Sequence, residues 1–176
     1  MSVAPPHVQE RSRHIAQGEY LIGDGRGGPI STILGSCVAS CLFDIEARLG
    51  GMNHFLLPDG ASVGVQAASF GINAMELLIN ALIKQGAVRA RLQAKVFGGA
   101  RMISGLTDIG AKNSEFIRAF LCREGIACVG ASLGGTHARR VEFWPESGRA
   151  RQRVLAAVRV EERAPALALG NDVELF

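Results

Sequence analysis

Two residues in the first third of the chain, Cys37 and His54, could act together as a thiol nucleophile and its base. Cys37 follows a Gly-Ser pair in an apolar segment that begins at Ile30, and His54 lies in a second apolar segment that ends at Pro58. The short charged stretch 45–49 between them predicts a β-hairpin, in which His54 is opposite or diagonal to the first residues after the Gly-Ser pair. Such neighbours are separated by roughly 4.5–8 Å. A thiol within reach of an imidazole is the minimal unit of thiol catalysis.

The residues before Cys37 favour the same chemistry. Gly35 and Ser36 allow close approach of the backbone to a substrate, and their N–H groups could stabilise a developing oxyanion. A purely structural interpretation is also open, because free cysteines are among the most frequently buried residues. The local pattern by itself leaves both interpretations standing.

Five blocks of sequence together carry a family resemblance. They are G-S-C-V-A-S-C-L-F-D and G-G-M-N-H-F-L-L-P around Cys37 and His54, then K-V-F-G-G-A-R-M, I-G-A-K-N and G-G-T-H-A-R-R-V-E-F. In this order they resemble the chemoreceptor glutamine deamidase (CheD) family, over roughly residues 18 to 160. The resemblance implies a protein-glutamine glutaminase that deamidates glutamines of methyl-accepting chemoreceptors in chemotaxis. A cytoplasmic location is expected separately, from the lack of an apolar signal region and of a membrane-length apolar run.

The resemblance also implies a Cys–His–Thr catalytic group. Cys37 and His54 match the first two positions, whereas the position six residues before Cys37, where the family has Thr, is Ser31 in this chain, with Thr32 beside it. Residues separated by an even number share one face of a regular strand. We therefore expect Ser31 to orient His54, and Thr32 to do so only if a bulge shifts the register.

Further expectations concern the cleft and the partners. Gly98, Gly99 and Gly134 lie in the later blocks and are expected to frame the substrate cleft around Cys37. The mechanism needs no cofactor and no metal. The resemblance implies chemoreceptor cytoplasmic domains as partners, and a CheC-type phosphatase as a further one. Two alternative functions remain open: a non-catalytic chemotaxis adaptor that binds receptors and such a phosphatase, and a receptor methylesterase.

Composition narrows the class of protein. A chain of 176 residues with 48% apolar and 20% charged residues is typical of one globular domain. No apolar run reaches the ~18 residues of a membrane span, and the N-terminus has no apolar signal region. The net charge of +3 comes without a nucleic-acid-binding motif, so we expect no nucleic acid partner and interpret the arginines between 139 and 159 as a solvated face or a docking surface. The other three cysteines show no C-x-x-C spacing and are expected in the core: Cys41, Cys122 and Cys128.

The order of elements predicts an α+β fold. A flexible tail over residues 1–17 and a second tail over 161–176 are expected to flank one domain over 18–160. Strands are expected at 18–24, in the hairpin around Cys37 and His54, at 92–96 and 126–132, and in a final hairpin of 141–144 and 151–158. One helix carries the apolar stripe Met75, Leu78, Ile79 and Leu82, and a second helix is expected to begin at Asn113 or Ser114. This content predicts a layered sandwich of mixed β-sheet with two main helices packed on it.

Overall fold

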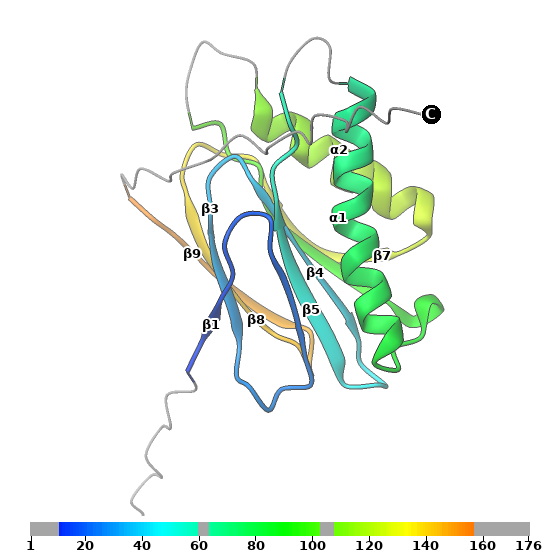
Figure 1. The fold of residues 1–176 in the computed structure, drawn as a ribbon. Coiled ribbons are helices and arrows are strands. Elements are labelled where there is room, and N and C mark those ends of the chain that lie inside the picture. Colours follow the sequence, from blue (N-terminus) through cyan, green and yellow to red (C-terminus); the bar gives the residue numbers. More distant parts are fainter. Residues whose placement is uncertain (1–10, 60–63, 103–107, 157–176) are drawn as a thin grey trace, which may run out of the picture.

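The computed structural model describes residues 11–59, 64–102 and 108–156, which form two β-sheets and two α-helices (Figure 1). The four-stranded sheet has the order β1 (Arg13–His14), β3 (Ile30–Leu34), β8 (Arg139–Trp144) and β9 (Arg149–Val154). The five-stranded sheet has the order β2 (Tyr20–Gly23), β5 (Leu49–Phe55), β4 (Val38–Asp44), β6 (Gln93–Gly98) and β7 (Ala127–Leu133). Helices α1 (Gly64–Lys84) and α2 (Ile109–Glu124) complete the fold, with a short 3₁₀ turn at Arg89–Arg91. The predicted α+β sandwich is confirmed.

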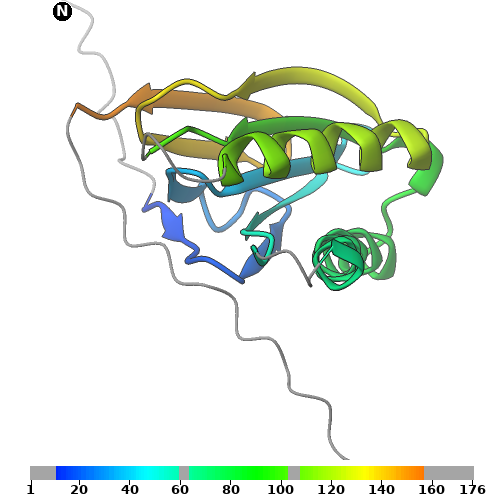
Figure 2. The ribbon, with the colours of Figure 1, turned by 90° about the horizontal axis from the view of Figure 1, so that it is seen from above.

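The five-stranded sheet is the middle layer of the molecule. Both helices pack on one of its faces, and the four-stranded sheet covers the other (Figures 1 and 2). Strand β4 is buried along its whole length because its side chains alternate between these two layers. Val38 and Leu42 join the helix layer, while Ala39, Cys41 and Phe43 join the layer between the sheets.

Helix α1 begins earlier than the apolar stripe that predicted it. Its stripe packs against the five-stranded sheet, and the side chains of Met75, Leu78, Ile79 and Leu82 are fully buried. By length and composition only, the segment Val65–Lys84 is the one described helix that could span a membrane. The residues 60–63 that precede the helix, part of the predicted loop, lie outside the described ranges.

Helix α2 begins at Ile109, so the predicted start at Asn113 or Ser114 is wrong. Asp108 is the cap, and its Oδ1 accepts a hydrogen bond from Ala111 N at 2.9 Å. Gly110 lies in the first helical turn. A Cβ atom there would collide with the carbonyl oxygen of Ala100, so the close packing of backbone on helix requires glycine.

Residues 13–17, which were expected in a flexible tail, belong to the fold. Strand β1 pairs in parallel with Ile30 and Ser31 of β3, and the side chain of Ile15 is buried. A two-residue strand is too short to leave a periodic pattern in the sequence. The second predicted tail, 161–176, lies outside the described residues.

The final predicted hairpin is confirmed as β8 and β9, which pair from Arg139↔Val154 to Trp144↔Arg149. Cys41 is buried as expected, but Cys122 and Cys128 are exposed, and that part of the core prediction is wrong. Cys122 lies on the outer face of α2, and Cys128 lies on β7, the edge strand of its sheet. The neighbour Leu121 of Cys122 is buried, whereas Ala127 and Val129 on either side of Cys128 are exposed with it.

Candidate active site

The residues Gly35, Ser36 and Cys37 form the loop by which the chain crosses from one sheet to the other. Strand β3 ends at Leu34 in the four-stranded sheet, and β4 begins at Val38 in the five-stranded sheet. Cys37 therefore lies at the end of the layer between the sheets, with a fully buried side chain. We call Gly35–Cys37 the crossing loop.

All three carbonyl groups of the crossing loop accept hydrogen bonds, two from the segment that follows β6 and one from α2. Ala100 N donates to the oxygen of Gly35 at 2.9 Å, and Gly99 N donates to that of Cys37 at 2.8 Å. The buried Asn113 of α2 donates from Nδ2 to the oxygen of Ser36 at 2.9 Å. These bonds fix the peptide planes of the loop, and hence the position of the thiol.

Asn113 is a site residue that the sequence reasoning missed. Its Oδ1 accepts a hydrogen bond from Leu57 N at 2.9 Å, so one amide connects α2, the crossing loop and the chain after β5. The available signal was its position: Asn113 occupies the buried stripe of α2, where Ile117, Phe120 and Leu121 are all apolar. A polar side chain at such a position needs partners, and here both are backbone groups.

The glycines predicted to frame the cleft lie together beside the crossing loop. Gly98 has a φ of 111°, and a Cβ atom there would collide with the carbonyl oxygen of Cys37. Gly134 N donates to the oxygen of Gly98 at 2.9 Å, which joins the two glycine-containing loops. Gly99 and Gly134 line a hollow of about 610 Å³, together with two cations and two anions: Arg101, Arg118, Asp108 and Glu115.

His54 and Cys37 lie on the same face of the five-stranded sheet. In the β4–β5 ladder His54 pairs with Ala39, two residues after Cys37, so the predicted hairpin is confirmed. Cys37 precedes the first pair of the ladder, and its side chain packs in the same layer as Ala39. Met52 and Leu56, two residues either side of His54, also pack in the layer between the sheets. The imidazole is buried, with only 5% of its surface exposed.

Thr32, and not Ser31, contacts the imidazole. Thr32 Oγ1 lies 2.8 Å from His54 Nδ1 and 2.8 Å from the carbonyl oxygen of Ile15. Because a carbonyl can only accept, the single hydroxyl hydrogen of Thr32 goes to Ile15, and the hydroxyl oxygen accepts from Nδ1–H. His54 is therefore held as the tautomer in which Nε2 carries no proton and is free to act as a base.

The prediction that Ser31 shares the catalytic face is thus wrong, and the reason is the crossing loop. Counting positions between residue 31 and Cys37 assumes one regular strand, but the chain changes sheets at Gly35. On β3 the residues that face the other sheet are Ile30, Thr32 and Leu34, as their alternate spacing requires. Ser31 belongs to the opposite set.

The electrostatic environment keeps His54 neutral. Burial, together with the nearby His14, lowers the pKa of His54 to about 4, against an opposing effect of Glu19. Within the described residues no hydrogen bond reaches its Nε2 atom, although that atom is buried. A buried imidazole nitrogen without a partner is costly unless another group uses it. The thiol of Cys37 packs in the same layer between the sheets.

The segment 15–19, of which residues 15–17 were expected in the tail and 18–19 in the first strand, completes the site. Its backbone brackets His54: Gly18 N donates to His54 O at 2.7 Å, and His54 N donates to Glu19 O at 3.0 Å. In the same turn Gln17 Oε1 accepts from the thiol of Cys37 at 3.6 Å. This segment supplied no recognisable motif, because its contacts are made mostly by backbone.

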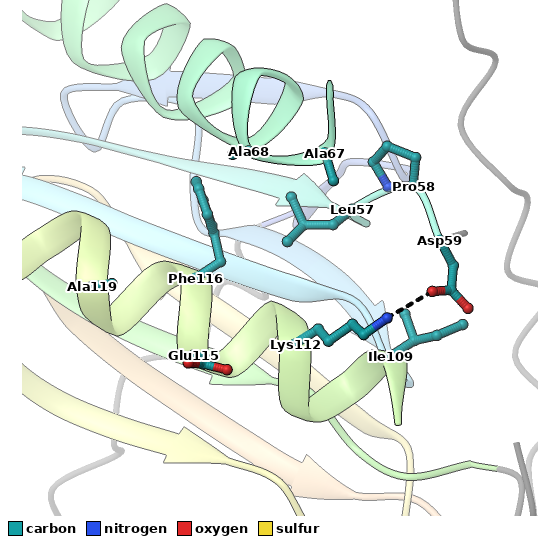
Figure 3. A pocket seen from close by; sticks show the side chains of 10 residues that line it. All are labelled: Leu57, Pro58, Asp59, Ala67, Ala68, Ile109, Lys112, Glu115, Phe116 and Ala119. Carbon is teal, nitrogen blue, oxygen red and sulfur yellow. Dashed lines mark hydrogen bonds and ion pairs between the residues drawn. The ribbon is translucent and has the colours of Figure 1, made fainter. Parts of the chain in front are cut away.

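A second hollow, of about 500 Å³, lies between α1 and α2 next to the end of β5 (Figure 3). Leu57 and Phe116 belong to its apolar part, and an ion pair of 2.9 Å joins Lys112 Nζ to Asp59 Oδ1 at its edge.

Across the described ranges, no group of three or more His, Cys, Asp or Glu side chains is placed to hold a metal ion. The site therefore offers a thiol, an imidazole and hydrogen-bond donors as its chemistry.

Two comparisons with known proteins, with family models and with individual relatives, identify the same family. The model of the CheD family, described as CheD chemotactic sensory transduction, matches residues 56–154. A probable chemoreceptor glutamine deamidase CheD of Rhizobium meliloti is 52% identical over 154 residues, which cover 86% of this chain and 84% of that protein. A protein described in the same words from Rhizobium leguminosarum bv. trifolii is 50% identical, and the match covers 94% of this chain and 96% of that protein. Another from Caulobacter sp. is 49% identical, and the match covers 93% of this chain and 92% of that protein. Among solved structures, the Bacillus licheniformis hypothetical protein YfiH is 15% identical with a TM-score of 0.45, over 70% of this chain and 59% of that one.

Proposed function

The chain belongs to the CheD family, and from that premise we propose that it is a protein-glutamine deamidase that converts specific glutamines of chemoreceptors to glutamate. The relatives are described as probable chemoreceptor glutamine deamidases, and this chain matches them over most of their length. The observation that carries the proposal is the Thr32–His54 hydrogen bond of 2.8 Å, because it leaves Nε2 of His54 as a base on the face that also carries Cys37.

In this mechanism Cys37 is the nucleophile. Its Sγ–H proton moves to Nε2 of His54, and the sulfur forms a bond to the side-chain amide carbon of a receptor glutamine. The electron pair of the C=O bond moves onto oxygen, and the backbone N–H groups of Ser36 and Cys37 stabilise the oxyanion, with Gly35 allowing the close approach. The fixed carbonyls of the crossing loop support this assignment, because all of them are bonded on the side of β6 and α2.

His54 then acts as an acid and afterwards as a base. It returns its proton to the departing nitrogen, so that the C–N bond breaks and ammonia leaves a thioester. Water attacks the thioester carbon while His54 accepts a proton from it, the C–S bond breaks, and the glutamate side chain is released with the Cys37 thiolate, which is protonated again. Thr32 holds the imidazole in one tautomer throughout.

The low pKa of His54 fits the first step of this cycle. A neutral imidazole accepts a proton, whereas an imidazolium does not. The negative charge that develops on the sulfur raises the proton affinity of Nε2 as the proton is transferred, so the pair titrates as a unit. We propose no cofactor or metal for the reaction.

The receptor segment that carries the glutamine is proposed to enter at the hollow lined by Gly99 and Gly134. Residues without side chains allow a segment to pass close to the crossing loop. The hollow is lined by two arginines and two carboxylates, so its charge favours neither an acidic nor a basic partner. We propose cytoplasmic receptor domains as the substrate, a cytoplasmic location for the enzyme, and a CheC-type phosphatase as a regulatory partner. The adaptor and methylesterase alternatives have no observation in their favour, and an adaptor has no use for a buried Nε2 without a partner.

The experiment that tests the proposal is incubation with a glutamine-bearing receptor cytoplasmic fragment. Ammonia release and the mass of tryptic peptides would be followed together. Conversion of glutamine to glutamate in step with ammonia supports deamidation. Release of methanol from a methylated fragment without ammonia would instead identify a methylesterase.

A further inference from the structure

The carboxamide of Gln17 lies against the thiol of Cys37, and the mechanism above gives it no role. The donor is the thiol and the acceptor is Oε1 of Gln17, at 3.6 Å. Gln17 is half-buried and lies in a segment far from Cys37 in sequence. A carboxamide at the nucleophile has a chemical consequence, because it carries two N–H donors as well as its oxygen.

The backbone of Gln17 is held in place on both sides. Residues 16–19 form a tight turn in which Glu19 N donates to Ala16 O at 3.1 Å, and Gly18 has a φ of 87°, as the third position of a type II turn requires. Glu19 Oε2 also accepts from Ala16 N at 2.8 Å. Since Gly18 N bonds to His54 O, the turn is attached directly to the strand that carries the imidazole.

We propose that Gln17 is a catalytic residue whose side-chain N–H stabilises the oxyanion, next to the backbone donors of the crossing loop; this inference rests on the proposed deamidase function. In the resting enzyme the neutral thiol donates to Oε1 of Gln17. Once the proton has moved to His54, the sulfur has nothing to donate, and rotation of the carboxamide about its last bond turns Nε2 towards the reacting centre. The substrate oxygen becomes negatively charged one bond away from the carbon that the sulfur attacks, within the reach of that amide.

Two other roles for the same contact give different results in the same experiment. If Gln17 merely occupies the place of the substrate carboxamide, its removal increases the rate. If Cys37 attacks Gln17 itself, the wild-type protein accumulates glutamate at position 17 with loss of ammonia. Neither outcome is compatible with a donor that stabilises the transition state.

The test compares Gln17→Met and Gln17→Glu with the wild-type enzyme and with Gln85→Met. Methionine has a similar length but donates nothing, glutamate keeps the shape but only accepts, and Gln85 is an exposed residue after α1. The readouts are kcat and KM for ammonia release from the receptor fragment, the melting temperature, and the mass of the peptide that contains residue 17.

We expect Gln17→Met to lower kcat by about a hundredfold with little change in KM and no loss of melting temperature, since one oxyanion donor contributes ~10²–10³ in kcat. Gln17→Glu should be slower still, and its pH optimum should move upward, because a carboxylate beside the thiol raises the pKa of Cys37. Gln85→Met should equal the wild type.

A wild-type kcat for Gln17→Met, a rise in its kcat, or glutamate at position 17 in the wild-type protein would each overturn the inference while leaving the deamidase intact. A wild-type enzyme that releases no ammonia would overturn the proposed function, and this inference with it. The two failures are therefore distinguishable.

Discussion

The hairpin of β4 and β5 buries an ionisable group at each end, Asp44 where the two strands are joined and His54 near the end where they are not. The two groups differ in their hydrogen-bond partners. At the closed end, Asp44 accepts hydrogen bonds from Ala47 N at 3.1 Å, from Val88 N at 2.9 Å and from the guanidinium of Arg91 at 2.9–3.1 Å. At the open end, His54 has Thr32 on Nδ1, while within the described residues nothing bonds to Nε2. Both side chains are buried on neighbouring strands.

The consequences for charge differ accordingly. Burial raises the pKa of Asp44, but the hydrogen bonds from Arg91, Val88 and Ala47 outweigh it, and the pKa falls to about 2. Burial of His54 has no such compensation, and its pKa falls to about 4, so that it is neutral at physiological pH. Asp44, whose hydrogen-bond partners are all present, contributes to the stability of the fold. His54, which lacks a partner on one ring nitrogen, is available for chemistry.

The largest effect is expected at the open end, from His54→Ala. Without a base for the thiol proton, turnover should fall by about a thousandfold or more in the ammonia assay. The matched control is Cys41→Ala, which alters a buried thiol on the same face of the same sheet. That variant should keep most of its activity per folded molecule, and an active His54→Ala would contradict the assignment of the base.

A smaller but still large effect should separate Thr32 from Ser31. Thr32→Ala removes the group that fixes the tautomer of His54, so kcat should fall by roughly a hundredfold or more. Ser31→Ala should stay within about threefold of the wild type, since its side chain is on the other side of β3. Thr32→Ser keeps the hydroxyl and should restore most of the rate. The opposite order, with Ser31→Ala slower than Thr32→Ala on folded protein, would mean that Thr32 does not orient the base.

At the closed end the effect should be on stability and not on rate. Asp44→Asn keeps the shape but sets a donor against the donors that surround it, which should reduce the free energy of unfolding by about 2 kcal/mol or more. The control is Glu46→Gln, because Glu46 also pairs with Arg91, at 3.0 Å, but is 73% exposed. Its effect should be below about 0.5 kcal/mol. Loss of kcat in correctly folded Asp44→Asn would show that the two ends are coupled.

The last effect is on stability alone, and it is the pH dependence that His54 gives to the free energy of unfolding. In the unfolded chain His54 takes up a proton below about pH 6.5, and in the native protein only below about pH 4. Stability should therefore fall as the pH is lowered through this window, by about 3 kcal/mol in total from His54 alone. In denaturant titrations, the free energy of unfolding of the wild type should rise relative to that of His54→Gln as the pH rises from 4 to 6.5. Parallel curves would mean that the imidazole is not held neutral.

The sequence was informative where a local pattern and the final geometry coincide. The two apolar segments and the short charged stretch 45–49 between them predicted the hairpin, and the hairpin brings His54 opposite Ala39, two residues after Cys37. Apolar stripes located both helices, because each packs one face on the sheet. The family blocks marked the glycines that the structure places beside the crossing loop.

The sequence-based predictions failed where the chain changes sheets and where backbone groups make the contacts. No periodicity reveals that β3 and β4 lie in different sheets, so the parity count that favoured Ser31 could not be applied across Gly35. Gln17 lies in a segment held by backbone hydrogen bonds, which are independent of residue type. Asn113 was read as a helix cap because its true partners, Ser36 O and Leu57 N, are distant in sequence.

The most direct measurement of the central claim follows single glutamines of a receptor cytoplasmic fragment by mass spectrometry. The fragment is incubated with wild-type enzyme, with Cys37→Ala or with Cys41→Ala, and ammonia is measured in the same samples. We predict that wild type and Cys41→Ala convert the same glutamines to glutamate with one ammonia for each, and that folded Cys37→Ala converts none. Conversion by Cys37→Ala at the wild-type rate would show that the chemistry does not take place at the crossing loop.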